Sequence, residues 1–100
     1  MRHIYNTTFI VEENIEREWV AYMQECYIRT VFSSGLPADV IFTKVSIDQP
    51  EGKTYSLQLV FSSGQDLERF LEHHLAPAEE ELISHYKNRY LCFSSTLTEI

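Results

Sequence analysis

The sequence predicts an α+β domain of β-α-β-β-α-β order, in which four antiparallel strands carry two helices on one face of the sheet. Three observations support this prediction: four segments with strand-like composition, two long segments with helical spacing of apolar residues, and turn residues placed between them. The strand-like segments are His3–Val11, Val40–Ile47, Thr54–Phe61 and Tyr90–Leu97. Two β-α-β halves with right-handed crossovers, joined by a central hairpin, form a sandwich of the ferredoxin-like type.

The segment after the first strand predicts a helix over residues 15–32, with Asn14 as its N-cap. Apolar residues recur there at the i, i+4, i+7, i+8 and i+11 spacing of one helical face. They are Ile15, Trp19, Tyr22, Met23 and Cys26, and Val20, Tyr27 and Val31 widen the same face. We therefore expect this face, Cys26 included, to lie in the core.

Turn residues mark the ends of these elements. Gly35 and Pro37 follow the first helix, as residues that end a helix usually do. The segment Asp48–Lys53 contains a proline and a glycine between two strand-like runs, and this pattern predicts a hairpin loop.

The second helix is expected to start after Ser63, whose hydroxyl can cap it with Asp66 three residues later. Its inner stripe is predicted to be Leu67, Phe70, Leu71 and His74. Pro77 should kink or restart the helix, which then continues to about residue 87.

Length and charge limit the possible functions. One hundred residues with 44% hydrophobic content make one packed domain, residues 1–100. A net charge of −7 disfavours binding to nucleic acid or anionic lipid. No apolar run is long enough for a membrane span, so we expect a soluble, cytoplasmic protein with no membrane association. Cys26 and Cys92 form no metal or disulfide motif and are expected to be buried, reduced thiols.

The four strand-like segments contain only one formally charged residue, Lys44. A sheet covered by helices on one face normally exposes its other face to water, and that face then carries charged side chains. Three interpretations compete for this neutral face: a surface wetted through Thr and Ser, a single-stranded RNA platform, or an interface with a second copy of the chain. RNA binding is disfavoured because the chain is acidic and lacks the glycine-aromatic signature of RNA-recognition motifs.

The favoured interpretation is sheet-on-sheet dimerisation, which would bury on the order of 800 Å² per partner. Hydroxyl and amide groups can hydrogen-bond across such a seam. We therefore expect a glutamate introduced at Gln58 or Ser94 to disrupt the dimer, because the new charge would be buried without a partner.

Four motifs carry a family resemblance that spans nearly the whole chain. They are Ile4–Thr8 (IYNTT), Glu18–Met23 (EWVAYM), Tyr55–Gln58 (YSLQ) and Arg89–Phe93 (RYLCF). With this strand order, the chain resembles a family of short bacterial proteins of unknown function, which is similar to the dimeric α/β-barrel superfamily. The resemblance implies a ferredoxin-like subunit that pairs with a second copy through its sheet.

The same superfamily includes antibiotic-biosynthesis monooxygenases, haem-degrading monooxygenases and small isomerases, whose pockets usually lie between sheet and helices. The haem-degrading branch has an Asn on its first strand, which Asn6 matches, and a Trp and an iron-ligating His on its second helix. Phe70 and Glu80 stand at the latter two positions here. The departure argues against haem, and no cofactor is expected.

Six residues are candidates for a pocket or for the dimer seam: Asn6, Trp19, Tyr22, Gln58, Tyr86 and Tyr90. Asn is depleted in strands, so Asn6 either orients a ligand or satisfies a hydrogen bond in the fold or across the seam. Gln58 has the same two interpretations, and Trp19 is favoured as a core residue. Arg89 either binds an anionic group or serves as a cation near a helix C-terminus.

The i, i+4 spacing of Glu81 and His85 is compatible with a zinc site, with Glu80 or His74 as a further ligand. The plainer interpretation is a charged helix start followed by surface histidines, and we expect no bound metal.

The sequence thus predicts a homodimeric, non-catalytic binding or assembly module. The alternative is a cofactor-independent monooxygenase or isomerase that acts on a small aromatic or carbonyl compound. Catalytic residues are not identified, and a small-molecule ligand remains possible under both hypotheses.

Overall fold

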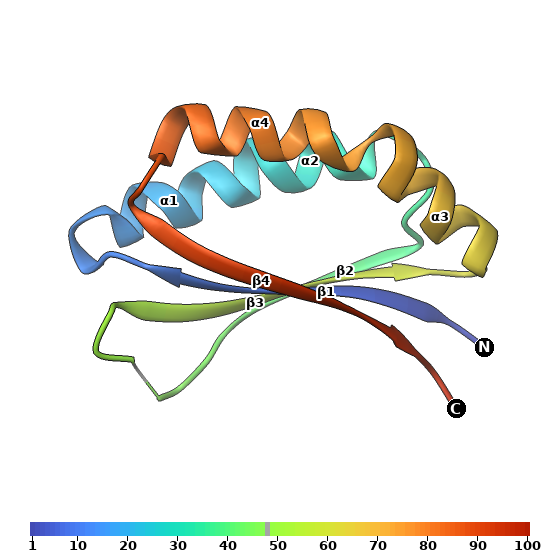
Figure 1. Ribbon diagram of the computed structural model, residues 1–100, viewed down its shortest axis with the longest axis horizontal. Coiled ribbons are helices and arrows are strands. Elements are labelled where there is room, and N and C mark those ends of the chain that lie inside the picture. Colours follow the sequence, from blue (N-terminus) through green and yellow to red (C-terminus); the bar gives the residue numbers. More distant parts are fainter. Residues whose placement is uncertain (48) are drawn as a thin grey trace.

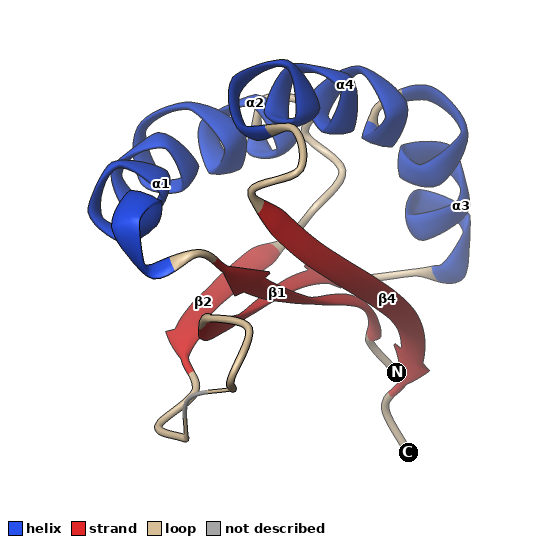
Figure 2. Ribbon diagram, turned by 60° about the vertical axis from the view of Figure 1, so that its left-hand side comes forward, coloured by secondary structure: helices blue, strands red, loops and turns tan. Residues whose placement is uncertain are grey.

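A computed structural model describes residues 1–47 and 49–100 and confirms the predicted order of strands and helices. The elements are β1 (His3–Val11), the 3₁₀ turn η1 (Glu13–Ile15), α1 (Glu16–Tyr22), η2 (Met23–Tyr27), α2 (Ile28–Phe32), β2 (Asp39–Lys44), β3 (Lys53–Phe61), α3 (Gly64–His73), α4 (Leu75–Tyr86) and β4 (Tyr90–Thr98). The strands form one antiparallel sheet of order β2-β3-β1-β4. All helices lie on the same side of this sheet (Figures 1 and 2).

The strands match their predicted bounds closely. β1 has the predicted bounds, whereas β2 ends at Lys44 rather than at Ile47. In the hairpin, Gln49 and Gly52 exchange backbone hydrogen bonds of 3.1 Å, which confirms a tight turn over the described part of the loop. Asp48, the first residue of the predicted loop, lies outside the described residues. Gly52 is required sterically, because a Cβ there would collide with the backbone of Val11.

The first helix contains a π-helical segment, η2, between α1 and α2. Its buried residues recur strictly every four positions, at Ile15, Trp19, Met23, Tyr27 and Val31. An α-helix has 3.6 residues per turn, so this spacing would drift around the helix; the wider π turn corrects the drift. Tyr27 is thereby turned into the core and Cys26 outward, so the prediction that Cys26 is buried is wrong.

The second helical region confirms its predicted start and its break. Ser63 Oγ accepts a hydrogen bond of 3.2 Å from the backbone N–H of Asp66, as a capping residue does. The helix is interrupted at His74, and α4 restarts so that Pro77 lies in its first turn, where a missing N–H costs little. Because His74 lies at this break it is exposed, which corrects its predicted place in the inner stripe.

Asn14 does not cap the first helix. Its side-chain oxygen instead accepts a hydrogen bond of 3.0 Å from Arg89 Nη2, and neither η1 nor α1 has a side-chain cap. A contact between segments distant in the sequence has replaced the local one.

The core lies between the helices and the face of the sheet that they cover, which we call the helix face. Trp19 is fully buried at its centre, with ring centroids 5.2 Å from Phe9 and Tyr55 and 5.9 Å from Phe42. Its indole nitrogen is buried without a hydrogen-bond partner among the described residues. Trp19 is therefore a packing residue, as favoured from the sequence. No helix in the described residues has the length and apolar character that a membrane crossing requires.

Candidate functional site

The face of the sheet opposite the helices, which we call the open face, is almost free of charge. Strand pairing places on it Ile4, Asn6, Thr8 and Ile10 from β1, Asp39, Ile41 and Thr43 from β2, Thr54, Ser56, Gln58 and Val60 from β3, and Leu91, Phe93, Ser95 and Leu97 from β4. Among these strand residues Asp39, near one corner of the sheet, is the sole formal charge on the open face. The neutral second face expected from the sequence is therefore present.

β4 contributes the most exposed apolar side chains of the open face. Leu91 is 59% exposed, Phe93 63% and Leu97 43%, and together with Ile41 on the far strand they frame the face with apolar groups. Isolated apolar side chains on a surface are common, but three on one side of the same strand, interrupted only by Ser95, are typical of an interaction surface.

The middle of the open face is polar. Asn6 is paired in register with Gln58 on one side and Ser95 on the other, and Ser56 Oγ donates a hydrogen bond of 3.1 Å to Asn6 Oδ1. The structure thus places Asn6 and Gln58 together on the open face, away from the helices. Their remaining amide groups are available to a molecule that covers this face.

The other side of β4 faces the helices but is not covered by them. Cys92, Ser94 and Thr96 point to the helix face, yet all three are exposed. The prediction that Cys92 is buried is therefore wrong, because the helices do not reach over this edge strand. Ser94 was expected at the seam and is not there either: its hydroxyl bonds that of Thr7 at 2.8 Å on the helix face.

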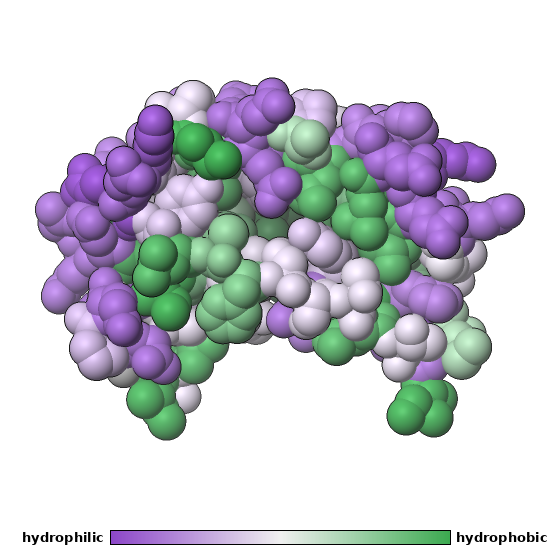
Figure 3. Space-filling model, viewed as in Figure 1, coloured by the Kyte–Doolittle hydropathy of each residue, from purple (hydrophilic) through white to green (hydrophobic). Residues whose placement is uncertain are grey.

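A groove runs between α4 and β4. It contains a cavity of about 500 Å³ that is lined by Ile83, Lys87, Asn88, Tyr90, Leu91 and Cys92. Figure 3 shows the surface hollowed between these two elements, with apolar side chains at the base of the hollow. On α4, Glu79 lies one turn before Ile83 and therefore on the same side of the helix.

Several titratable groups in the groove and on the neighbouring elements are partly withdrawn from water. Desolvation raises the pKa of the Glu79 carboxyl. Desolvation, with the nearby Glu79 charge as a smaller cause, also raises the pKa of the Tyr27 phenol and of the Cys92 thiol. The pKa of Tyr90 rises to about 12, chiefly through desolvation, with smaller effects of Cys92 and Glu79. Of these residues, Tyr90 and Cys92 line the cavity, whereas Tyr27 is buried in the core and Glu79 lies on α4 outside the lining.

Two other tyrosines of the predicted set lie between α1 and α4. The Tyr22 ring is 4.7 Å from His85 and 5.6 Å from Tyr86, and the Tyr86 hydroxyl donates to the Glu18 carbonyl at 3.3 Å. Burial raises the pKa of Tyr22 to about 12. The six predicted residues thus divide among the open face (Asn6, Gln58), the core (Trp19), the α1–α4 contact (Tyr22, Tyr86) and the groove (Tyr90), and do not converge on one site.

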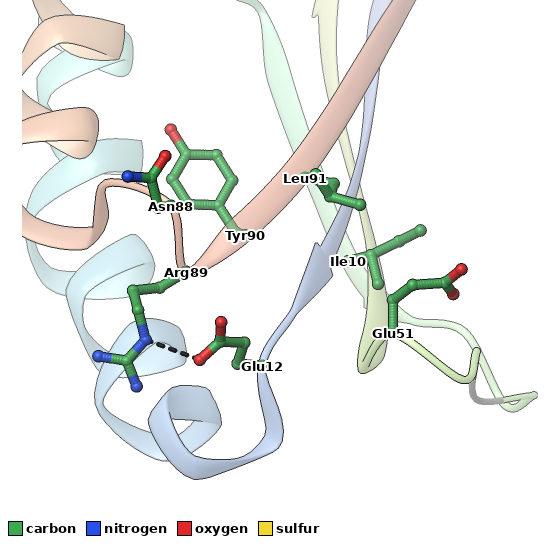
Figure 4. A pocket seen from close by; sticks show the side chains of 7 residues that line it. All are labelled: Ile10, Glu12, Glu51, Asn88, Arg89, Tyr90 and Leu91. Carbon is green, nitrogen blue, oxygen red and sulfur yellow. Dashed lines mark hydrogen bonds and ion pairs between the residues drawn. The ribbon is translucent and has the colours of Figure 1, made fainter.

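A second, smaller cavity of about 210 Å³ lies at the turn from α4 into β4 (Figure 4). Its lining residues are Ile10, Glu12, Glu51, Asn88, Arg89, Tyr90 and Leu91. Arg89 Nε donates to Glu12 Oε1 at 2.7 Å and Nη2 to Asn14, so its charge is already balanced within the fold. This engagement favours a structural role for Arg89 over anion binding.

The metal-ligand spacing seen in the sequence does not form a cluster. Over residues 1–47 and 49–100, no group of three or more His, Cys, Asp or Glu side chains is arranged to hold a metal ion. His85 Nδ1 lies 2.9 Å from the carbonyl oxygen of Glu81, and its ring packs against Tyr22 with the two ring planes tilted by 36°.

Glu79, a half-buried residue of α4, is not among the residues that the sequence singles out. It belongs to a run of three glutamates at a charged helix start. The signal that distinguishes it is its place beside the apolar stripe of Leu75, Ala78 and Leu82, whereas Glu80 and Glu81 lie away from that stripe and are exposed.

Comparisons with solved structures support the fold. An EthD family protein from Bacillus halodurans matches with a TM-score of 0.70 at 8% identity, covering 98% of this chain and 99% of that one. A dimeric ferredoxin-like protein from an uncultured marine organism matches with 0.62 at 10% identity, over 99% and 98% of the two chains. A variant of SnoaB, a cofactor-independent oxygenase from Streptomyces nogalater, matches with 0.62 at 13% identity, over 98% and 92%.

At these identities the likeness shows the fold alone, and it confirms the predicted ferredoxin-like class. No curated protein sequence matches the chain. A family model described as a domain of unknown function, DUF4286, matches residues 2–100, which confirms the resemblance to an uncharacterised family. The chain therefore belongs to the DUF4286 family.

Proposed function

We propose that the protein is a homodimeric binding or assembly module without catalytic activity, and that two copies pair through their open faces. The observation that carries this proposal is the open face itself, with exposed Leu91, Phe93 and Leu97 around a neutral polar centre. The dimeric ferredoxin-like protein from a marine organism supports it, because that protein shares the fold over nearly its whole length.

The chemistry of the open face suits a second copy better than water. Apolar burial at about 25 cal/mol per Å² favours covering the three β4 side chains, and few charges need to be desolvated. Around a two-fold axis, the Asn6 and Gln58 amides meet groups of their own kind, and an amide both donates and accepts. The open face is therefore complementary to itself, and a second copy of the same chain is a sufficient partner.

Two further segments, the loop between β2 and β3 and the C-terminal end, add to the surface around the open face. The loop between β2 and β3 and the C-terminal end both extend to the side away from the helices (Figures 1 and 2). Ile47 before the turn and Ile100 at the C-terminus are exposed there. Both segments are placed to flank a partner that sits on the open face.

Light scattering at micromolar concentration tests the pairing. We expect about twice the chain mass for the protein and a monomer for Phe93→Glu, because the charge would be buried without a partner. Thr96→Glu is the matched control: Thr96 is exposed on the same strand but on the helix face, so this variant should remain dimeric. A monomeric wild type, or a dimeric Phe93→Glu variant, would contradict the proposal.

A cofactor-independent oxygenase or isomerase is the second candidate, supported by the α4–β4 groove. The groove is a preformed, partly polar cavity between helix and sheet, and SnoaB shows that this fold can carry a cofactor-independent oxygenase. Oxygen uptake, or spectral change, with a panel of phenols and cyclic ketones tests it. If the wild-type protein turns over a compound of the panel and the Tyr90→Phe variant does not, the result favours the enzyme hypothesis. If no compound is turned over, the result favours the binding module.

A further inference from the structure

The sheet has two edge strands, and they differ in how they are protected from pairing with another strand. β2 is six residues long and carries a charge at each end, Asp39 and Lys44. β4 is nine residues long, contains no charged residue, proline or glycine, and pairs with β1 residue by residue without a bulge. Short length, charges, prolines and bulges are the features that keep a sheet edge from pairing with a further strand. β2 has two of these features, whereas β4 has none.

The backbone of β4 presents every second residue to its free edge. At one end of the β1–β4 ladder the Glu12 N–H donates to the Arg89 carbonyl at 3.1 Å, and at the other end the Glu99 N–H donates to the Arg2 carbonyl at 2.8 Å. In an antiparallel pair, alternate residues bond to the neighbouring strand, and the residues between them point their N–H and C=O groups away from it. Both bonds give the same alternation along β4. The outward-pointing residues between its ends are Cys92, Ser94 and Thr96.

The described fold leaves this edge uncovered. β4 is the last strand of the order β2-β3-β1-β4, so no strand of residues 1–47 and 49–100 lies beside its outward-pointing groups. The side chains of Cys92, Ser94 and Thr96 are exposed as well, because the helices do not reach over β4. A further strand therefore finds free hydrogen-bonding groups and no charge along these residues.

The sequence of β4 is suited to pairing with itself. Its middle residue is Ser94, one of the outward-pointing residues, so two antiparallel copies can overlap along the whole strand with Ser94 on the two-fold axis. In this register Leu91 lies opposite the partner's Leu97, on the side of the open face. The two leucines form a non-hydrogen-bonded pair, the kind that brings side chains closest, and symmetry repeats the pair. The contact brings no like charges together along the strand, although the chain carries a net charge of −7.

We infer that a second copy of the chain binds the free edge of β4, with β4 antiparallel to β4, so that two four-stranded sheets become one continuous sheet. An unrelated peptide would supply backbone groups alone, whereas a second copy also supplies the leucines that face each other. The contact goes beyond the proposed pairing and does not rest on it, because it uses the edge of the sheet rather than the open face. Homodimers formed through the open faces would be linked by such edges into a larger assembly.

Sedimentation equilibrium of a Gln58→Glu background, at up to about 1 mM protein, tests the edge contact. Gln58 lies on the open face of β3, so this background disrupts open-face pairing and leaves the edge of β4 intact. We expect a reversible dimer whose association constant falls by at least about tenfold in Thr96→Pro, because proline removes an outward N–H from each copy. Thr96→Val is the matched control: it keeps the N–H and should associate as the background does.

A background that stays monomeric at every concentration, or equal association of the Thr96→Pro and Thr96→Val variants, would overturn the inference. If a variant fails to fold, hydrogen exchange of the unmodified protein decides instead. Raising its concentration should protect the amides of Cys92, Ser94 and Thr96, and exchange that does not change with concentration contradicts the edge contact. The amides of Phe93 and Ser95 bond to β1 and should be protected throughout. A wild type that is monomeric at micromolar concentration would contradict the open-face pairing alone, so the two proposals fail separately.

Discussion

β3 and β4 have the same alternating chemistry but opposite orientation. β3 turns Leu57, Leu59 and Phe61 toward the helices, where all three are buried, and presents Ser56 and Gln58 on the open face. β4 does the reverse: its apolar Leu91, Phe93 and Leu97 point outward, and its small polar residues point to the helix face. The difference shows that alternation defines a strand, whereas pairing register decides which of its faces meets the core.

The two strands should therefore respond differently to loss of an apolar side chain. Leu57→Ala removes a buried residue from the core, and we expect a loss of about 3 kcal/mol in the free energy of unfolding. Urea denaturation followed by circular dichroism measures this loss, which should not depend on protein concentration. A loss below about 1 kcal/mol would mean that the helix face of β3 is not the principal core.

Phe93→Ala should act through the dimer instead. Its side chain is mostly exposed in the monomer, so we expect little change in monomer stability but a weaker dimer, by about 2 kcal/mol in association free energy. Sedimentation equilibrium over a concentration series measures this directly. A large, concentration-independent loss of unfolding free energy would show that Phe93 packs within one subunit.

Sequence periodicity predicted both strands because it depends only on local chemistry. It could not predict the orientation of β4, which follows from pairing with β1 and from helices that stop short of the sheet edge. The same limit explains Cys92, correctly placed in a strand but exposed, and Ser94, correctly judged polar but wrongly placed at the seam. For Cys26 the cause is different: a π turn inside the helix altered the face that α-helical spacing predicted.

Within the site, residues whose surroundings come from their own strand were easier to predict than those placed by tertiary contacts. Asn6 and Gln58 were recognised because amides are unusual in strands, and the structure places them side by side. Glu79 is harder to predict, because the helical pattern places it beside the apolar stripe of α4 but does not show how far that side of the helix is covered.

A smaller effect is expected at the edge of the core on the helix side of β3. The Tyr55 hydroxyl donates to Glu16 Oε2 at 2.6 Å, and Lys44 lies 2.9 Å from the same oxygen. The Tyr55 hydrogen bond, followed by that of Lys44, lowers the pKa of Glu16. Because the folded-state pKa is the lower one, the stabilisation is present above the ordinary pKa of a glutamate and is lost as pH falls through the lowered value.

Tyr55→Phe should therefore reduce the free energy of unfolding by about 1 kcal/mol at pH 7, and by progressively less as pH falls through the lowered pKa of Glu16 and the carboxylate is protonated. Urea denaturation over a series of pH values from 7 downward measures the difference. An equal loss at all pH values would assign the effect to packing of the ring rather than to the hydrogen bond with Glu16.

The smallest effect separates the two faces of β4 at adjacent residues. Ser94→Ala removes the 2.8 Å hydroxyl contact with Thr7 on the helix face, and we expect a loss of about 0.5 kcal/mol in monomer stability with no change in association. Ser95→Ala alters the open face opposite Asn6, so it should leave monomer stability unchanged and affect association alone. Monomer stability is measured by denaturing each alanine variant in the monomeric Phe93→Glu background. Association is measured by sedimentation equilibrium of each alanine variant without the Phe93→Glu substitution. If both alanine variants change the same quantity, the two sides of β4 do not have the separate roles that their side chains indicate.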